Sequence, residues 1–246
     1  MWDHLHREGI PLAKSTVERL MRRNGWQGVR RCKKVRTTIP DPDAVRPPDL
    51  VDRQFGVAAP NVLLVADFTY VKLVTGVFVY VAFVIDAYAG AIVGWEVSAS
   101  KHTRFVESAL RQAAALRARQ GRPIDGAIHH SDAGSQYTSV RFGETLSLSG
   151  IRPSVGSVGD AFDNALAETT IGLYKNECVR ADSPFRRGPL KTAGDVEYIT
   201  ADYVAWYNQD RLMHRLGRIP PAEAEARYYS QLVTGRPAGS QNPEGA

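Results

Sequence analysis

Three consecutive apolar runs in the first half of the chain constrain the fold more than any other feature. Each is rich in Val, Ile and aromatic residues and is bounded by Gly or Pro; they cover residues 61–73, 77–90 and 91–100. Thr75-Gly76 and Ala89-Gly90 lie between the runs, and both are residue pairs that suit tight turns. We therefore expect three antiparallel strands joined as a meander.

Helix-like and strand-like segments alternate after these runs. Residues 103–119 place Val106, Leu110 and Ala113 on one face, which is the periodicity of an amphipathic helix. Shorter segments follow. They indicate a strand at 126–132 that ends at Asp132, a helix at 139–149, a strand at 151–155 and a long helix at 165–177. Strands followed by alternating helices and strands predict an α/β layer with a mixed sheet.

Composition narrows the class of protein. With 246 residues and 43% hydrophobic content, the chain supports one core and a small appendage. No apolar run approaches the roughly 20 residues of a membrane span, and no secretory signal begins the sequence. Only Cys32 and Cys178 occur, so a disulfide framework and a zinc-ligand pattern are both excluded. These features favour a cytoplasmic protein.

Positive charge is concentrated at the N-terminus. Residues 1–40 hold ten Lys or Arg against three Asp or Glu, whereas the net charge of the whole chain is only +5. Arg30, Arg31, Lys33 and Lys34 form the densest part of this arm, which indicates a polyanionic partner such as nucleic acid, or else a solvated tail.

The segment before this arm resembles half of a helix-turn-helix. Ser15 and Glu18 have the spacing of a capping box, and residues 15–23 show one apolar face. The proline-rich segment that follows, residues 39–55, is typical of a linker.

Three acids are candidates for catalysis. Asp67 interrupts an apolar strand, Asp132 ends a short strand, and Glu168 lies within a helix. Carboxylates gathered from such positions would repel one another unless a cation neutralised them, and Mg²⁺ is the expected cation. Taken singly, each acid has a structural alternative: an ion pair, a turn cap or a solvated helix position. The acids that compete with them for such a role are Asp86, Asp160 and Asp163.

Several longer motifs resemble one family. They are "VADFTYV", "VYVAFVIDAYAGAIVGWEVS", "IHHSDAGSQYTS", "GSVGDAFDNALAETTIGLYKNE" and "WYNQDRLMHRLGRIPPAEA". Together they are similar to the catalytic protein of bacterial insertion-sequence transposases with a retroviral-integrase-like core, over about residues 5–230. The 35 residues between Asp132 and Glu168 match the spacing of that family's acid triad.

The resemblance implies the fold, the activity and the catalytic residues. It implies an RNase H-like α/β fold with a mixed five-stranded sheet and flanking helices, preceded by a partial helix-turn-helix segment. It assigns catalysis and metal binding to Asp67, Asp132 and Glu168, with two Mg²⁺ ions and Mn²⁺ as their substitute. We expect a DNA-binding segment at 1–38 and a linker at 39–60. A catalytic core at 61–180, a helical extension at 181–232 and a disordered tail at 233–246 are expected to follow.

DNA contacts are expected beside the triad. Lys175 lies two helical turns after Glu168, and Asn164 lies one turn before it, where Asn164 could orient a ligand or cap the helix. Asn208, Arg211 and His214 match a family pattern whose three-residue spacing suits one helical face. Arg211 and His214 are therefore candidates for DNA contacts, with helix packing as the alternative for Arg211.

The resemblance also implies partners. The first is double-stranded DNA, both the terminal repeats of the element and its target. The others are further copies of the chain assembled on DNA and a DNA-binding subunit from an upstream reading frame. Two departures from the family pattern remove positive charge: Ala133 replaces an arginine, and "AYAG" occupies 87–90. A catalytically weak or inactive DNA-binding regulator and an RNase H-like nuclease are the alternative functions.

Overall fold

A computed structural model describes residues 1–26, 47–132, 134–156 and 164–234. Its centre is a five-stranded sheet with strand order β3-β2-β1-β4-β5. The strands are β1 (Leu63–Lys72), β2 (Phe78–Asp86), β3 (Ala91–Ser98), β4 (Ile128–Ser131) and β5 (Arg152–Val155). The first three are antiparallel, whereas β4 and β5 run parallel to β1. The expected meander and the mixed sheet are both confirmed.

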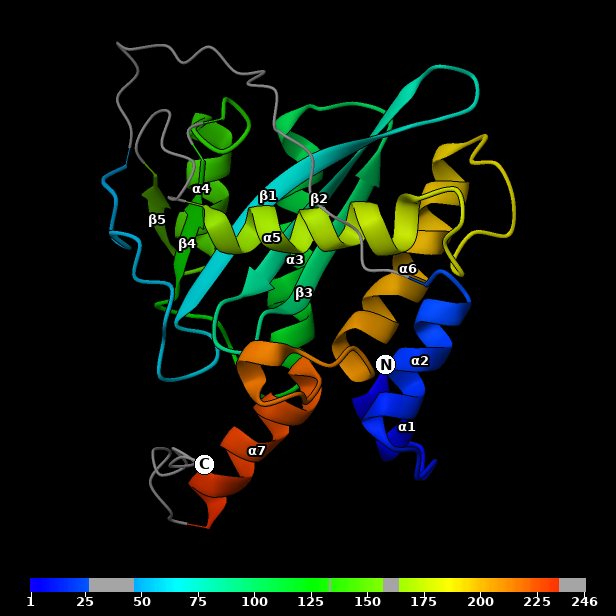
Figure 1. The fold of residues 1–246 in the computed structure, drawn as a ribbon. Helices are drawn as coiled ribbons and strands as arrows, with labels where there is room; N and C mark the ends of the chain where they lie inside the picture. Colours follow the sequence, from blue (N-terminus) through cyan, green and yellow to red (C-terminus); the bar gives the residue numbers. More distant parts are fainter. Residues whose placement is uncertain (27–46, 133, 157–163, 235–246) are drawn as a thin grey trace.

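Helices cover both faces of this sheet (Figure 1). One face packs against α3 (Thr103–Arg119) and α4 (Val140–Leu148). The other face packs against α5 (Ala165–Tyr174), its π-helical continuation Lys175–Val179, and α6 (Ala193–Gln209). Alternation along β1 explains the two layers, because Leu64 and Ala66 enter the first core while Leu63 and Val65 enter the second.

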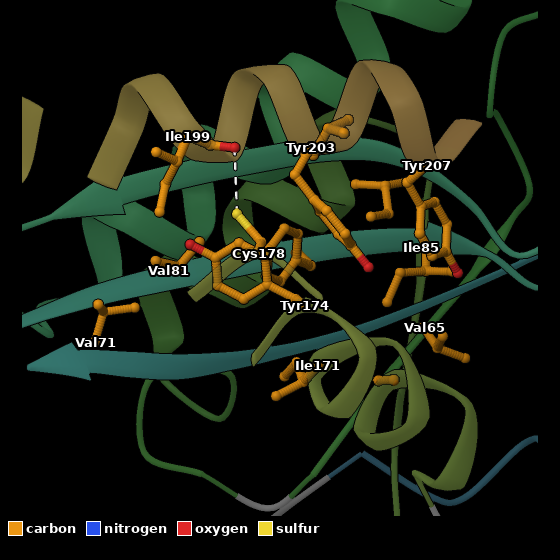
Figure 2. Close-up of a cluster of buried hydrophobic side chains, with 14 of the residues drawn as sticks. Val65, Val71, Val81, Ile85, Ile171, Tyr174, Cys178, Ile199, Tyr203 and Tyr207 are labelled. Atoms are coloured by element: carbon orange, nitrogen blue, oxygen red, sulfur yellow. Dashed lines mark hydrogen bonds between the residues drawn. The ribbon is translucent and has the colours of Figure 1, made fainter. Parts of the chain in front are cut away.

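The core between the sheet and α5–α6 is rich in aromatic residues. Figure 2 shows Tyr174 and Tyr203 among the valines and isoleucines of β1 and β2, with their ring centroids 5.5 Å apart. The Cys178 thiol lies in the same core and donates to the Ile199 carbonyl at 3.3 Å. Burial raises the pKa of Cys178 to about 12, so the thiol stays protonated.

The terminal helices lie beside one another at one end of the sheet (Figure 1). They are α1 (Trp2–Arg7), α2 (Lys14–Arg23) and α7 (Pro221–Val233), and a 3₁₀ turn, His214–Leu216, precedes α7. Arg7 pairs with Glu223. None of the helices in the described ranges has the length and apolar character needed to cross a membrane.

Two local expectations are wrong. The helix α2 begins at Lys14 after Ala13, so Ser15 lies inside the helix and forms no capping box with Glu18. The helix α6 ends at Gln209, so Arg211 and His214 are not on one helical face with Asn208. Residues 30, 31, 33 and 34 of the basic arm, together with 133, 160 and 163, lie outside the described residues.

Candidate active site

Two of the predicted acids lie side by side at one edge of the parallel strand pair. Ala66 of β1 pairs with Ser131 of β4; Asp67 follows Ala66 on β1, and Asp132 is the residue directly after β4. Neighbouring strands lie about 4.8 Å apart, so the register alone brings these two carboxylate-bearing residues together. The backbone N–H of Phe68 donates to Asp67 Oδ1 at 2.7 Å. Both acids are half-buried.

Asp132 is held by the turn that follows it. The N–H of Gly134 donates to Asp132 Oδ1 at 3.1 Å, and a Cβ at position 134 would lie 2.9 Å from that oxygen. A side chain at position 134 would therefore displace the Asp132 carboxylate from this position. Burial raises the pKa of Asp132; the bond from Gly134 opposes the shift, and the charge of Glu168 adds to it.

Glu168 comes to the two aspartates from α5, which packs on the face of the sheet that Leu63 and Val65 line. It lies in the first turn of α5, where the helix dipole favours a negative charge. Its influence on the pKa of Asp132 indicates that the carboxylates of Glu168 and Asp132 are close together. The crossing of α5 over β1 is visible in Figure 1.

Asn164 fastens the start of α5 to β1. Its side chain is only 6% exposed, and Nδ2 donates to the carbonyl of Ala66 at 3.0 Å. That carbonyl belongs to the residue before Asp67, and the carbonyl of Asn164 itself accepts from the N–H of Glu168 at 3.0 Å. Asn164 occupies the N-cap position but makes no side-chain cap bond. It therefore links the elements that carry Asp67 and Glu168.

Tyr137 is a residue at this site that the motifs did not single out. Its ring is buried beside Phe68 and His129. Burial raises the pKa of Tyr137 strongly, and the charges of Asp67 and Asp132 raise it further. The phenol is therefore neutral and close to both aspartates. Its position in "SQYTS" offered no periodic signal by which to recognise it.

The carboxylates are neighbours without forming a closed ligand set. In the described part of the chain, no group of three His, Cys, Asp or Glu side chains is arranged to hold a metal ion. Burial and the charge of Glu168 raise the pKa of Asp132, and a bound cation would lower it. Carboxylate oxygens are also the donors that Mg²⁺ prefers, so the residues present suit that ion.

The remaining predicted DNA contacts are scattered. Lys175 follows the last residue of α5, and its Nζ lies 4.8 Å from the centroid of the Tyr70 ring. Arg211 forms two hydrogen bonds to Glu177, at 2.7 and 2.8 Å, which matches the packing alternative considered for it. His214 is exposed in the 3₁₀ turn.

Asp86 belongs to a buried ion cluster of its own and not to the group of three acids. It is fully buried and lies 3.0 Å from the Arg117 guanidinium, which also binds Glu225 of α7 at 2.6 Å. Burial raises the pKa of Asp86, although the backbone N–H of Asn61 and the charge of Arg117 oppose this shift. This acid therefore has a structural role, joining the C-terminal helix to the sheet.

The neighbouring histidines are buried as well. His129 packs edge-to-face against Phe142 with ring centroids 5.1 Å apart, and burial lowers its pKa to about 3. His130 Nδ1 lies 2.8 Å from the hydroxyl oxygen of Ser154. Both rings thus contribute to packing beside the acids.

Comparison with solved structures identifies the fold. The chain aligns with the catalytic core domain of HTLV-2 integrase, solved in complex with magnesium, at a TM-score of 0.53 and 21% identity, covering 69% of this chain and 99% of that one. It also aligns with a chain of a simian T-cell lymphotropic virus intasome at a TM-score of 0.58 and 17% identity, covering 84% and 65%. The fold is RNase H-like, as in retroviral integrase cores.

Sequence comparison identifies the family. Integrase core domain families match residues 57–161 and 149–221. The chain is 51% identical to a Mycobacterium tuberculosis protein named as a transposase for insertion sequence element IS986/IS6110, covering 94% of this chain and 81% of that protein. It is 50% identical to the transposase for IS629 of Shigella sonnei, covering 94% and 74%. The chain belongs to the insertion-sequence transposases with an integrase-like core.

Proposed function

We propose that this transposase cleaves the ends of its element and joins them to target DNA, using Asp67, Asp132 and Glu168 as its catalytic acids. One observation carries the proposal. The Ala66–Ser131 register brings the two aspartates together at the carboxyl end of β4, and Glu168 is close enough for its charge to add to the burial that raises the pKa of Asp132. Three acids that meet from two strands and a helix suit a site for phosphoryl transfer.

The same three carboxylates are proposed to hold two Mg²⁺ ions, with Mn²⁺ as a substitute. When bound, the metal would neutralise charge at the scissile phosphate and activate the attacking oxygen. The chain's own groups would hold the acids in place. The N–H groups of Phe68 and Gly134 orient the two aspartates, and Asn164 fixes α5 against β1. Most of the catalysis would then come from positioning and electrostatics.

DNA contacts and assembly form the finer part of the proposal. Lys175 and Asn164 would lie beside the DNA end, while His214 and the arm residues Arg30, Arg31, Lys33 and Lys34 would contact DNA farther away. Arg211 is left with its packing role, because Glu177 accepts two hydrogen bonds from its guanidinium. Further copies of the chain and an upstream-frame subunit would assemble on the element's terminal repeats, and the cytoplasmic nucleoid is the expected location. The proposal divides the chain into a DNA-binding segment at 1–38, a linker at 39–60 and a catalytic core at 61–180. A helical extension at 181–232 and a tail at 233–246 complete the division.

The test uses labelled duplexes that carry the element's terminal repeats and end in a free 3′-hydroxyl. We expect joined products in Mg²⁺ or Mn²⁺ and none in EDTA or with Glu168→Gln. Metal-dependent hydrolysis without joining would instead indicate a nuclease. Salt-sensitive binding with no product in any metal would indicate a regulator that occupies element ends.

A further inference from the structure

The tip of the β1–β2 hairpin, on the strand that carries Asp67, bears an exposed aromatic pair. Tyr70 and Phe78 are 51% and 42% exposed, and their ring centroids lie 5.2 Å apart at an interplanar angle of 85°. Tyr70 is three residues beyond Asp67 on the same strand. At about 3.3 Å per residue, its Cα lies roughly 10 Å along β1 from that of Asp67, and alternation along the strand directs the two side chains to opposite faces of the sheet. The Tyr70 ring is connected to the face that carries the acids by Lys175, which follows α5 and whose Nζ lies 4.8 Å from the ring centroid.

The position of α3 explains why this pair is uncovered. On the same face of the hairpin, Phe68 and Tyr80 pack on Phe105 of α3, with ring centroids 5.4 and 6.4 Å away. The strands continue past that contact, and the hairpin projects from the body of the sheet (Figure 1). Tyr70 and Phe78 therefore make an aromatic surface at the tip of the hairpin, on the α3 face of the sheet, with no helix of the described part over it.

Positive charge borders this surface. The Nζ of Lys175 lies 4.8 Å from the Tyr70 ring centroid, and the exposed Lys72 is two residues after Tyr70 on the same strand face. Aromatic rings beside lysines are the combination by which proteins bind unpaired nucleotides: bases stack on the rings and phosphates meet the cations. A second copy of the chain fits less well, because a twofold contact through this surface would bring like charges together.

From these observations we infer that Tyr70 and Phe78 form a stacking site for an unpaired base at the DNA end, within a few nucleotides of the scissile phosphate. The inference rests on the proposed function, since it requires a DNA end to lie over the three acids. Bringing a strand into the site means separating its terminal base pairs, which costs a few kcal/mol of lost stacking and pairing by analogy with base flipping. Stacking on the hairpin returns part of that cost.

The test measures how strongly the protein prefers a duplex with a splayed end of two unpaired nucleotides over the same duplex with a blunt end. Loss of a base–aromatic stack corresponds to a weakening of about 5- to 150-fold. We therefore expect Tyr70→Ala to reduce binding of the splayed duplex by that factor and binding of the blunt duplex far less. Tyr70→Phe keeps the stacking face and should retain the preference.

Tyr198 of α6 offers a matched control. It is 43% exposed, and the guanidinium carbon of Arg187 lies 4.8 Å from its ring centroid, so it reproduces the exposure and the cation contact. Tyr198→Ala should leave the splayed-end preference unchanged. Equal losses on blunt and splayed duplexes, or no loss with Tyr70→Ala, would overturn the inference. If Tyr70→Ala changes the oligomeric state of the protein in the absence of DNA, the surface binds a second copy of the chain and not an unpaired base, and the inference is overturned.

The same measurements distinguish failure of the stacking site from failure of the proposed transposition chemistry. If the wild-type protein cleaves and joins DNA with metal but Tyr70→Ala keeps the splayed-end preference, the stacking site is wrong and the transposition chemistry stands. If no metal-dependent product forms while the Tyr70-dependent preference persists, the hairpin binds unpaired DNA and the catalytic proposal falls.

Discussion

Asn164 is expected to set the geometry of the acid site, and substituting it tests that role. The Asn164→Ala change removes the hydrogen bond from Nδ2 to the Ala66 carbonyl while that carbonyl remains in the core. Leaving a buried acceptor without its partner costs about 1–3 kcal/mol of unfolding free energy. The start of α5 then loses a tether to β1, and Glu168 shifts relative to Asp67. A displacement of about 1 Å at a catalytic group lowers the rate about 100-fold.

Asn61 provides the control for this prediction. Its side chain also donates a single hydrogen bond to a backbone carbonyl, that of Arg122, at 2.9 Å, but it lies away from the acids. Asn61 has a φ of 64°, so alanine there adds backbone strain to the lost bond. Asn61→Ala should therefore lose at least as much stability as Asn164→Ala.

The assay combines thermal unfolding with the rate of strand joining at saturating Mg²⁺. We expect Asn164→Ala to lose no more stability than Asn61→Ala does. The joining rate should fall about 100-fold for Asn164→Ala and should stay near that of the wild type for Asn61→Ala. Equal rates for the two variants would refute the reasoning, because Asn164 would then contribute nothing beyond ordinary packing.

Three further predictions concern stability and reactivity. Arg117→Met should lower the free energy of unfolding by about 3–5 kcal/mol, because two buried carboxylates lose their cation, whereas Arg227→Ala at an exposed pair should cost under about 1 kcal/mol; chemical denaturation distinguishes them. Because His129 has a folded-state pKa near 3 against 6.5 when unfolded, unfolding takes up a proton below pH 6.5. Stability should therefore fall by about 2 kcal/mol between pH 7 and pH 5, and His129→Phe should remove that component. Cys178, with a pKa of about 12, should resist a thiol reagent at pH 8 until the chain is unfolded; rapid labelling in the folded protein would contradict its burial.

The sequence was sufficient for elements whose signals are local. The helix at 103–119 was expected at the bounds that α3 has, because its apolar spacing is regular and Gly121 and Pro123 follow it. The position of Asp132 after β4 was foreseen in the same way. The 35-residue spacing between Asp132 and Glu168 matched the acid triad of the family, and the resemblance left Asp86 with a structural or supporting role.

Features that depend on distant residues were not accessible to the same reasoning. The pairing of Asp86 with Arg117 and Glu225 joins segments far apart in the chain, so Asp86 looked like a rival for the metal. Arg211 was expected on a helical face, but α6 ends at Gln209 and the guanidinium turns to Glu177 in the π-helix. A π-helix has no periodic signature in a single sequence, so this pairing had no local signal.

The three acids can be tested most directly one at a time in a single strand-joining assay. Asp67→Asn, Asp132→Asn and Glu168→Gln each keep the side-chain shape and remove one charge. The account predicts that every one of them abolishes metal-dependent joining while the far-ultraviolet circular dichroism stays that of the wild type. Full joining activity in any one of these variants, with the fold intact, would contradict the assignment of that acid and the three-carboxylate site.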